Sequence, residues 1–161
     1  MRAEITRQAE GYIAEFERNL THSPTNVWNM LNDNSRLKQW FEELQIGKSG
    51  KGGHLLFDMG DGAVEELRIT DYEEGRILAF EWWGDHVRFE VEDKNGGSLL
   101  RLVETIQRIT PQTAKDLAGW HVCLDAIESI LDGEKLDRDT EWQHWHEEYK
   151  RLLDSMTVEF E

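Results

Sequence analysis

The sequence predicts an α+β domain in which a curved antiparallel sheet of about seven strands wraps around one long helix near the C-terminus. Apolar and polar residues alternate through most of the first 106 positions, which is the period of half-buried strands. Short turn sequences rich in Gly, Asn and Asp separate these stretches, so we expect an antiparallel meander. A long amphipathic helix follows, and its apolar stripe must be buried against one face of the sheet.

The predicted order is one strand, two short helices, six strands and the long helix. The opening strand is Gly11 to Leu20. Ser23-Pro24 begins the first short helix, because the hydroxyl caps early N–H groups and proline suits the first helical position. The second short helix runs from Ser35 to about Phe41. The remaining strands are expected at Glu43 to Lys48, His54 to Met59, Ala63 to Tyr72, Arg76 to Trp82, His86 to Glu92 and Ser98 to Ile106.

Thr110-Pro111 is a second capped helix start, and Gly133 lies where that helix should stop. An additional terminal helix is expected from Thr140, which forms a capping box with Gln143. Between Pro111 and Gly133 the apolar side chains recur every three or four residues and form one stripe: Leu117, Trp120, Leu124, Ile127 and Leu131. A sheet that curls around this stripe can leave an unfilled pocket.

Length and charge set limits on the kind of protein. The 161 residues fit a single domain, 1–161, with a core at about 11–133 and an added helix in 134–161. The net charge of −15 repels nucleic acids and anionic membranes, so neither is expected as a partner. Cys123 is the one cysteine, and the N-terminus has no apolar signal core, so we expect a cytoplasmic protein.

Several stretches resemble the START-like (SRPBCC) superfamily, and within it the stand-alone bacterial homologues of the activator of heat shock protein 90 ATPase. They extend over roughly residues 11–133, and their order and spacing are more specific than any one of them. In chain order they are Ser23-Pro24, Val27-Trp28, Leu37, Trp40-Phe41, Gly52-Gly53, Ile77-Leu78-Ala79-Phe80-Glu81-Trp82, Ser98 to Glu104, Gly119-Trp120, Leu124 and Ile127.

The resemblance implies a helix-grip (START-like, Bet v-like) fold, with a cavity for apolar small molecules or lipids in many relatives. It also implies a chaperone-binding role in some eukaryotic relatives. Those activators generally depend on an additional N-terminal domain, for which this chain has no room. The terminal helix lies outside the shared core, so the resemblance says little about its role.

Large apolar side chains on three strands and two helices are the candidate walls of a ligand cavity. Plain core packing explains most of them better than a ligand does, because burying each one stabilises the fold by about 1.5–3 kcal/mol. Some of them can still face a void. The candidate residues are Trp40, Leu78, Phe80, Trp82, Phe89, Val91, Leu100, Leu102, Trp120, Leu124 and Ile127.

No metal or cofactor site is expected. His144 and His146 lie two residues apart on a predicted helix, so they point in different directions and favour a solvated polar face. The segment Asp58 to Gly62 lacks the spaced oxygen ligands of a calcium loop and favours a hairpin turn.

No catalytic site is expected either. His121 and Cys123 diverge on a helix, which favours a half-buried structural pair. Glu81, Glu104 and Arg88 are candidates for acid–base chemistry, but outward-facing cross-strand ion pairs explain them better. The sequence contains no P-loop, dinucleotide-binding glycine pattern or nucleophile elbow.

Two functions therefore stay open, with a third in reserve. The first is non-enzymatic binding of an apolar or amphipathic, lipid-like molecule between the long helix and the sheet. The second is an interaction module for a chaperone or other stress partner. An enzyme on the same fold is the reserve, because a fold does not fix a function. The sequence does not predict an oligomeric state.

Overall fold

The computed structural model describes residues 2–159, with side chains up to residue 156. The chain forms two compact units, Met1–Gln107 and Arg108–Glu161, and each is described by itself. The predicted terminal segment 134–161 extends past the described residues at positions 160 and 161.

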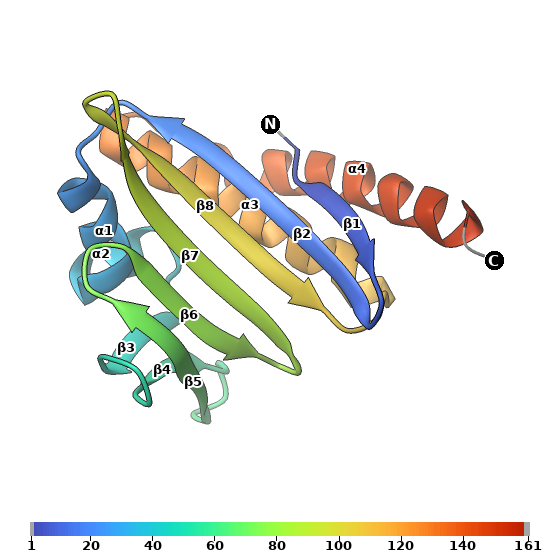
Figure 1. Cartoon of the computed structure of the whole chain (residues 1–161), viewed down its shortest axis with the longest axis horizontal. Helices are drawn as coiled ribbons and strands as arrows, with labels where there is room; N and C mark the ends of the chain where they lie inside the picture. Colours follow the sequence, from blue (N-terminus) through green and yellow to red (C-terminus); the bar gives the residue numbers. More distant parts are fainter. Residues whose placement is uncertain (1, 160–161) are drawn as a thin grey trace. The chain divides into compact units, whose positions relative to one another are not determined.

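The first unit holds an eight-stranded antiparallel sheet in the order β1-β2-β8-β7-β6-β5-β4-β3 (Figure 1). Sequential strands pair through short turns, apart from β2, which pairs with β8. The meander predicted from the turn sequences is therefore confirmed. The strands are β1 (Glu4–Gln8), β2 (Gly11–Leu20), β3 (Leu44–Lys48), β4 (His54–Asp58), β5 (Val64–Glu73), β6 (Ile77–Trp82), β7 (Asp85–Lys94) and β8 (Gly97–Ile106).

Strand β1 is the element that the sequence analysis missed. It lies at the edge of the sheet and pairs with β2 from Glu4 opposite Glu15 to Gln8 opposite Gly11. Four of its five side chains are exposed, so its sequence carries no apolar alternation. An edge strand held mainly by backbone hydrogen bonds leaves little trace in the hydrophobic pattern.

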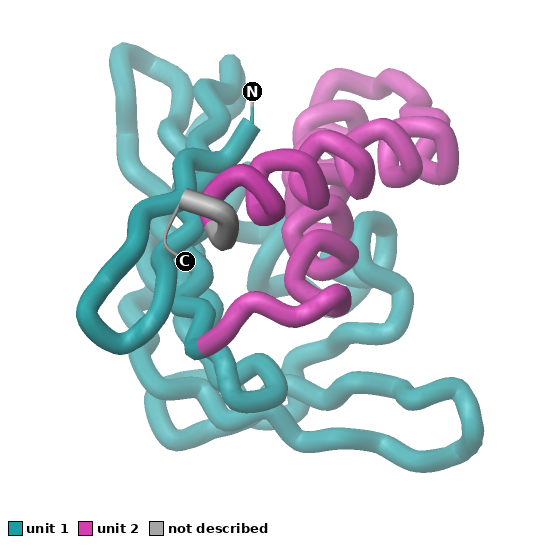
Figure 2. Tube along the Cα trace, turned by 90° about the vertical axis from the view of Figure 1, so that its right-hand side faces the viewer, with its two compact units in different colours: residues 1–107 teal, residues 108–161 magenta. Residues whose placement is uncertain are grey.

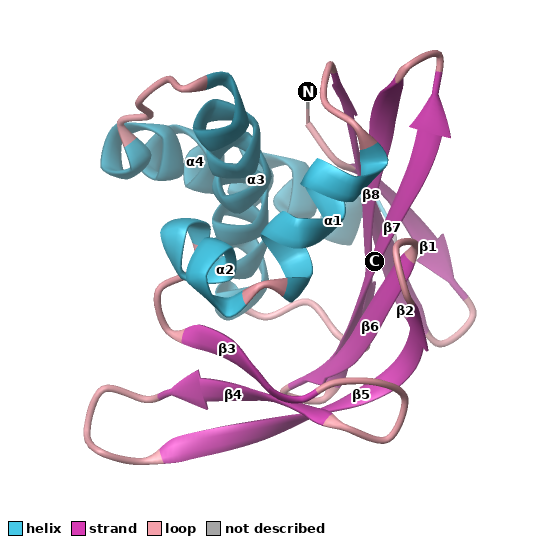
Figure 3. Ribbon diagram, turned by 90° about the vertical axis from the view of Figure 1, so that its left-hand side faces the viewer, coloured by secondary structure: helices cyan, strands magenta, loops and turns pink. Residues whose placement is uncertain are grey.

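The sheet is strongly curved (Figure 3). The pairing of β5 with β6 shifts register between Ile69 and Asp71, which leaves Thr70 as the extra residue of a β-bulge. A bulge bends its strand and increases the local twist. The bend lets β3, β4 and the first half of β5 turn away from the direction of β7 and β8 (Figure 3).

Helices α1 (Pro24–Asn32) and α2 (Asn34–Trp40) lie against the same unit. Ser23 caps α1, as predicted, by accepting a hydrogen bond from the Asn26 N–H at 3.2 Å. The cap of α2 is Asp33, two residues before the predicted start. The indole N–H of Trp40 donates to the Met30 carbonyl at 2.7 Å, which fixes the two helices against each other.

The second unit consists of α3 (Pro111–Asp132) and α4 (Arg138–Glu159), which pack against each other (Figure 2, magenta). Thr110 caps α3 and Gly133 ends it in the left-handed conformation with φ 73°, as predicted. The predicted capping box at Thr140 is wrong, because α4 begins two residues earlier. Asp137 accepts hydrogen bonds from the Thr140 N–H and hydroxyl at 3.3 and 2.9 Å. Aspartate caps a helix as well as threonine does, and it comes first in the chain.

No helix within residues 2–159 combines the length and the hydropathy needed to cross a membrane.

Candidate functional site

Apolar side chains from three neighbouring strands, β6, β7 and β8, lie side by side on the inner face of the sheet. The register places Leu78 opposite Phe89, and Phe89 opposite Leu102. Val91 lies opposite Leu100 in the next row. All of these side chains are buried. Their shared face, predicted from the period of two, is confirmed by the pairing.

Aromatic rings cover one end of this face and contact one another in a chain. Phe80 stacks on Phe89 with ring centroids 6.3 Å apart, and Trp40 meets Phe89 edge-on at 6.0 Å. Phe80 also contacts Trp82, with ring centroids 6.3 Å apart, and Trp82 lies nearer to the surface. The edge-to-face and offset geometries are those that aromatic pairs prefer. Helix α2 and strands β6 and β7 thus contribute to one cluster.

The outer end of the cluster holds three rings that were not among the candidate cavity residues of the sequence analysis. Phe41 and Phe57 each lie edge-on to Trp82, at 6.0 and 5.9 Å. Trp83 lies edge-on to Phe57 at 5.0 Å and to Trp82 at 4.8 Å. We call Phe41, Phe57, Trp82 and Trp83 the aromatic edge.

Exposure rises steadily from the inner rings to the aromatic edge. Phe80 is fully buried, Trp82 is 9% exposed and Trp83 is 47% exposed. Phe41 and Phe57 are half-buried. The cluster therefore begins as core and ends as a surface of aromatic rings that solvent reaches.

Trp83 is held in an unfavourable backbone conformation. It forms the two-residue turn between β6 and β7 with Gly84, and both residues have positive φ, 42° and 86°. Positive φ at both central positions is typical of a type I′ turn, where Asn-Gly is preferred. A bulky residue pays about 1–2 kcal/mol for this conformation. The turn between β7 and β8 uses Asn95-Gly96 in the same way without that cost.

The structure divides the predicted cavity residues between the two units, and all of them are buried. The first unit holds Trp40, Leu78, Phe80, Trp82, Phe89, Val91, Leu100 and Leu102. Trp120, Leu124 and Ile127 lie on α3. Their spacing of four and three residues puts them on one stripe of that helix, as expected. Their contact with a ligand stays a prediction.

The prediction that Glu104 faces outward in an ion pair is wrong, because its side chain is buried, at 1% exposure. It continues the alternating positions of Leu100 and Leu102 on β8, so the period of two turns it inward. Arg88 does point outward, as expected, but its partners are Asp71 at 2.8 Å and Glu90 at 2.7 Å. Neither Glu81 nor Glu104 forms an ion pair with Arg88.

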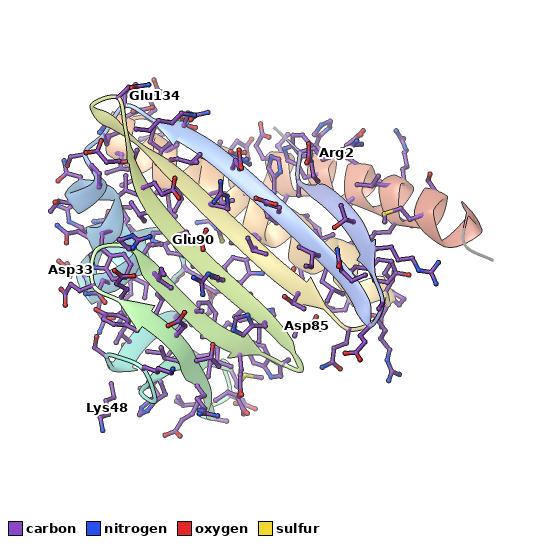
Figure 4. The ribbon with its side chains drawn as sticks, viewed as in Figure 1. Arg2, Asp33, Lys48, Asp85, Glu90 and Glu134 are labelled. Atoms are coloured by element: carbon purple, nitrogen blue, oxygen red, sulfur yellow. The ribbon has the colours of Figure 1, made fainter. Side chains whose placement is uncertain are left out.

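The outer face of the sheet carries a network of ion pairs. Figure 4 labels Glu90 midway along β7 and Asp85 at its start. Arg101 on β8 contacts Glu15 at 3.0 Å and Glu90 at 3.2 Å. The hydrogen bond from Arg88 holds the pKa of Glu90 below its usual range. This face is polar and charge-paired, in contrast to the inner face.

A polar hollow of about 450 Å³ lies at the β6–β7 turn on this outer face; its lining residues include Thr70, Glu81, Asp85, His86 and Thr105. The Thr70 hydroxyl and the His86 Nε2 are 2.6 Å apart. Burial lowers the pKa of His86 and raises that of Asp85. Thr70 is the extra residue of the β-bulge, and its hydroxyl contacts the imidazole of His86. Because its pKa is lowered, the imidazole is neutral at neutral pH.

We expect the stability of the protein to fall as the pH drops from 7.5 to 5.5, partly through His86. The folded state binds a proton on His86 less readily than the unfolded chain, so the unfolded state is favoured once the pH passes below the ordinary pKa of 6.5. The measurement is the free energy of unfolding at both pH values. The His86→Gln variant should lose less stability over this interval than the unchanged protein; an equal loss contradicts the prediction.

His121 and Cys123 do not form a half-buried pair, because both are buried and His121 has other partners. Its Nδ1 lies 2.7 Å from the Tyr149 hydroxyl, and Trp145 stacks on its ring at 3.8 Å. This cluster joins α3 to α4. The sequence signal for such a contact is a histidine on the apolar side of one helix together with aromatic residues, here Trp145 and Tyr149, on the next helix.

Among the side chains of residues 2–156, no group of three or more His, Cys, Asp and Glu is arranged to hold a metal ion. His146 stacks on Trp142 at 4.8 Å, and His144 contacts Trp145. The segment from Asp58 to Gly62 is a hairpin turn, as predicted: Asp58 caps the Gly60 N–H at 2.9 Å.

Comparison with known families matches residues 21–132 to the family described as activator of Hsp90 ATPase homolog 1-like protein. Comparison with curated proteins finds no match. A conserved protein of unknown function from Enterococcus faecalis has a similar structure, with a TM-score of 0.79 and 28% identity over 93% of this chain and 91% of that one.

Two further solved structures share the fold. CalU16 from Micromonospora echinospora has a TM-score of 0.75 and 19% identity, over 94% of this chain and 96% of that one. The Aha1 dimer from Colwellia psychrerythraea has a TM-score of 0.63 and 16% identity, over 73% of this chain and 93% of that one. The predicted helix-grip fold class is confirmed by these matches.

Proposed function

Because the chain belongs to the family of activator of Hsp90 ATPase homolog 1-like proteins, whose helix-grip fold it shares, we propose that it is a binding domain for an apolar or amphipathic small molecule. The ligand contacts the aromatic edge and the apolar inner face of the sheet, and no reaction is catalysed. The observation that carries this proposal is the rise in exposure along one cluster of rings, from buried Phe80 to half-exposed Trp83.

The chemistry of the aromatic edge suits a flat or flexible apolar ligand. Aromatic side chains offer large rigid surfaces, and edge-to-face contacts add about 0.5–1.5 kcal/mol to the burial of area. Sites for small molecules are mainly apolar, with few polar contacts.

The strained turn at Trp83 supports a role for this ring beyond folding. Asparagine or glycine fits the conformation without the cost, as Asn95 does at the neighbouring turn. A large apolar residue that is both strained and half-exposed adds little to folding stability. Such local costs are concentrated at functional sites.

The test replaces Trp83 with asparagine and measures binding of the uncharged fluorescent probe N-phenyl-1-naphthylamine. We expect the affinity for the probe to fall about fivefold, the equivalent of one aromatic contact. The free energy of unfolding should change by less than about 1 kcal/mol, because relief of the strained turn offsets the lost ring contacts.

Val64→Asn is the matched control. Val64 is 56% exposed. It pairs with Asp58, next to Phe57, so it points to the opposite face of the sheet. The control should bind the probe as the unchanged protein does. Equal affinities for all three proteins, or no binding by any of them, would sink the proposal.

A second candidate function is an interaction with a chaperone, favoured by the description of the matching family. Stimulation of the ATPase of a heat shock protein 90 by the full chain distinguishes the two. Stimulation that survives the Trp83→Asn change supports the chaperone function, whereas probe binding without stimulation supports the small-molecule function.

A further inference from the structure

A groove of about 420 Å³ lies between the start of α3 and the second half of α4, within the second unit. Its lining residues are Ile109, Thr110, Pro111, Ala114, Lys115, His146, Lys150, Leu153 and Asp154. It is distinct from the aromatic edge, which belongs to the first unit.

The groove has an apolar floor and a basic rim. Leu153 and Ala114 are buried, Ile109 is half-buried, and Lys115 and Lys150 are exposed. Two lysines and His146 face one acidic residue, Asp154, in a chain whose net charge is −15. The charge of the groove is therefore opposite in sign to the net charge of the chain.

Among the side chains that the structure describes, the two lysines have no acidic partner, unlike Arg76, Arg88 and Arg101. Arg76, Arg88 and Arg101 each form an ion pair with a carboxylate at 3.2 Å or less. Among the side chains described, up to residue 156, neither Lys115 nor Lys150 is within ion-pair distance of one. Two like charges on one groove repel each other, and a bound anion removes that repulsion.

The N-terminus of α3 does not supply the anion-binding groups. Proline at position 111 has no N–H, and the Gln112 N–H already donates to the Thr110 hydroxyl at 3.2 Å. The Thr113 N–H donates to the Thr110 carbonyl at 3.0 Å. Recognition of an anion here depends on the lysine side chains.

We propose that this groove binds a free amphipathic carboxylic acid. The carboxylate lies between the ammonium groups of Lys115 and Lys150, and the alkyl chain covers Leu153 and Ala114. The volume is within the range of small-molecule sites. A single concave groove suits one such molecule, whereas the surface of an anionic membrane would be repelled by the acidic remainder of the chain.

Dodecanoate, below the concentration at which it forms micelles, is the probe. Titration into ¹⁵N-labelled full-length protein should shift the amide signals of residues 109, 110, 112–115 and 146–154. The Lys115→Gln/Lys150→Gln variant should bind dodecanoate about tenfold more weakly, because two charge contacts are lost. Its affinity for uncharged dodecanol should not change.

Lys51→Gln/Lys135→Gln is the control, since it removes the same charge from exposed positions outside the groove. Unchanged dispersion of the amide signals shows that both variants are folded. The proposal fails if both variants lose the same affinity, if the shifted signals lie outside the groove, or if dodecanol binds as tightly as dodecanoate. Binding only to vesicles of phosphatidylglycerol also overturns it, in favour of a membrane surface.

Discussion

Replacing Phe80 with alanine is expected to lower the free energy of unfolding by about 3–5 kcal/mol, the usual cost of removing a buried phenylalanine. Phe80 is fully buried in the middle of β6 and stacks on Phe89. Its neighbours are held by paired strands, so they cannot collapse into the space left behind. A loss of this size is a large part of the stability of a typical domain.

Urea denaturation measures the loss, with the slope of the transition checked against that of the unchanged protein. Val64→Ala is the control, because an exposed valine on the outer face should contribute no more than about 0.5 kcal/mol. A loss below about 1 kcal/mol for Phe80→Ala would mean that its ring lies in unfilled space rather than in the core.

This result bears on how the aromatic cluster is divided between folding and binding. The burial of Phe80, Phe89 and Trp40 argues that the inner rings are core. We therefore expect changes there to act on stability, and changes at Trp83 to act on binding. Similar stability losses at Phe80 and Trp83 would contradict that division.

The strand pattern was predictable wherever one face of a strand is buried. Strand β2 begins and ends at the predicted residues, because Ala14, Phe16 and Leu20 alternate with exposed side chains. Strand β1 was not predictable, because nearly all of its side chains meet solvent. Apolar residues alternate along a strand only where one face is buried, and an exposed edge strand has no buried face.

The direction of polar side chains at inward positions of a strand was also not predicted correctly. Glu104 was expected to face outward because of its charge, although its place in the alternation of β8 points inward. The register of the strand outweighs the preference of one residue, since moving Glu104 outward would turn Leu100 and Leu102 to solvent.

The inner part of the candidate site was predictable and the aromatic edge was not. Trp40, Phe80 and Phe89 follow from strand and helix periodicity. Phe41, Phe57 and Trp83 come together from a helix end, a strand and a turn that are distant in the sequence. Trp83 in particular occupies a turn position where sequence rules expect glycine or asparagine.

The second large effect is expected at the buried contact between α3 and α4. Tyr149→Phe should lower the free energy of unfolding by about 1–3 kcal/mol, because the imidazole of His121 loses the hydroxyl 2.7 Å from its Nδ1. Both side chains are 0% exposed, so water cannot replace the hydroxyl without entering the helix pair. The phenyl ring itself keeps its packing, which isolates the hydrogen bond.

A double-mutant cycle separates this hydrogen bond from the loss of shape. The cycle compares Tyr149→Phe in the unchanged protein and in the His121→Phe variant. His121→Phe also removes the contact of the imidazole Nε2 with Asp125 at 3.3 Å, but that loss is the same on both sides of the comparison. The phenyl ring keeps an aromatic side chain beneath Trp145, which lies 3.8 Å from the imidazole. We expect Tyr149→Phe to lower the free energy of unfolding by less in the His121→Phe background than in the unchanged protein, since no imidazole nitrogen is then left without its partner hydroxyl. Additive losses in the two single variants would mean that the imidazole and the hydroxyl act independently. In that case the stability of the helix pair comes from apolar burial rather than from this contact.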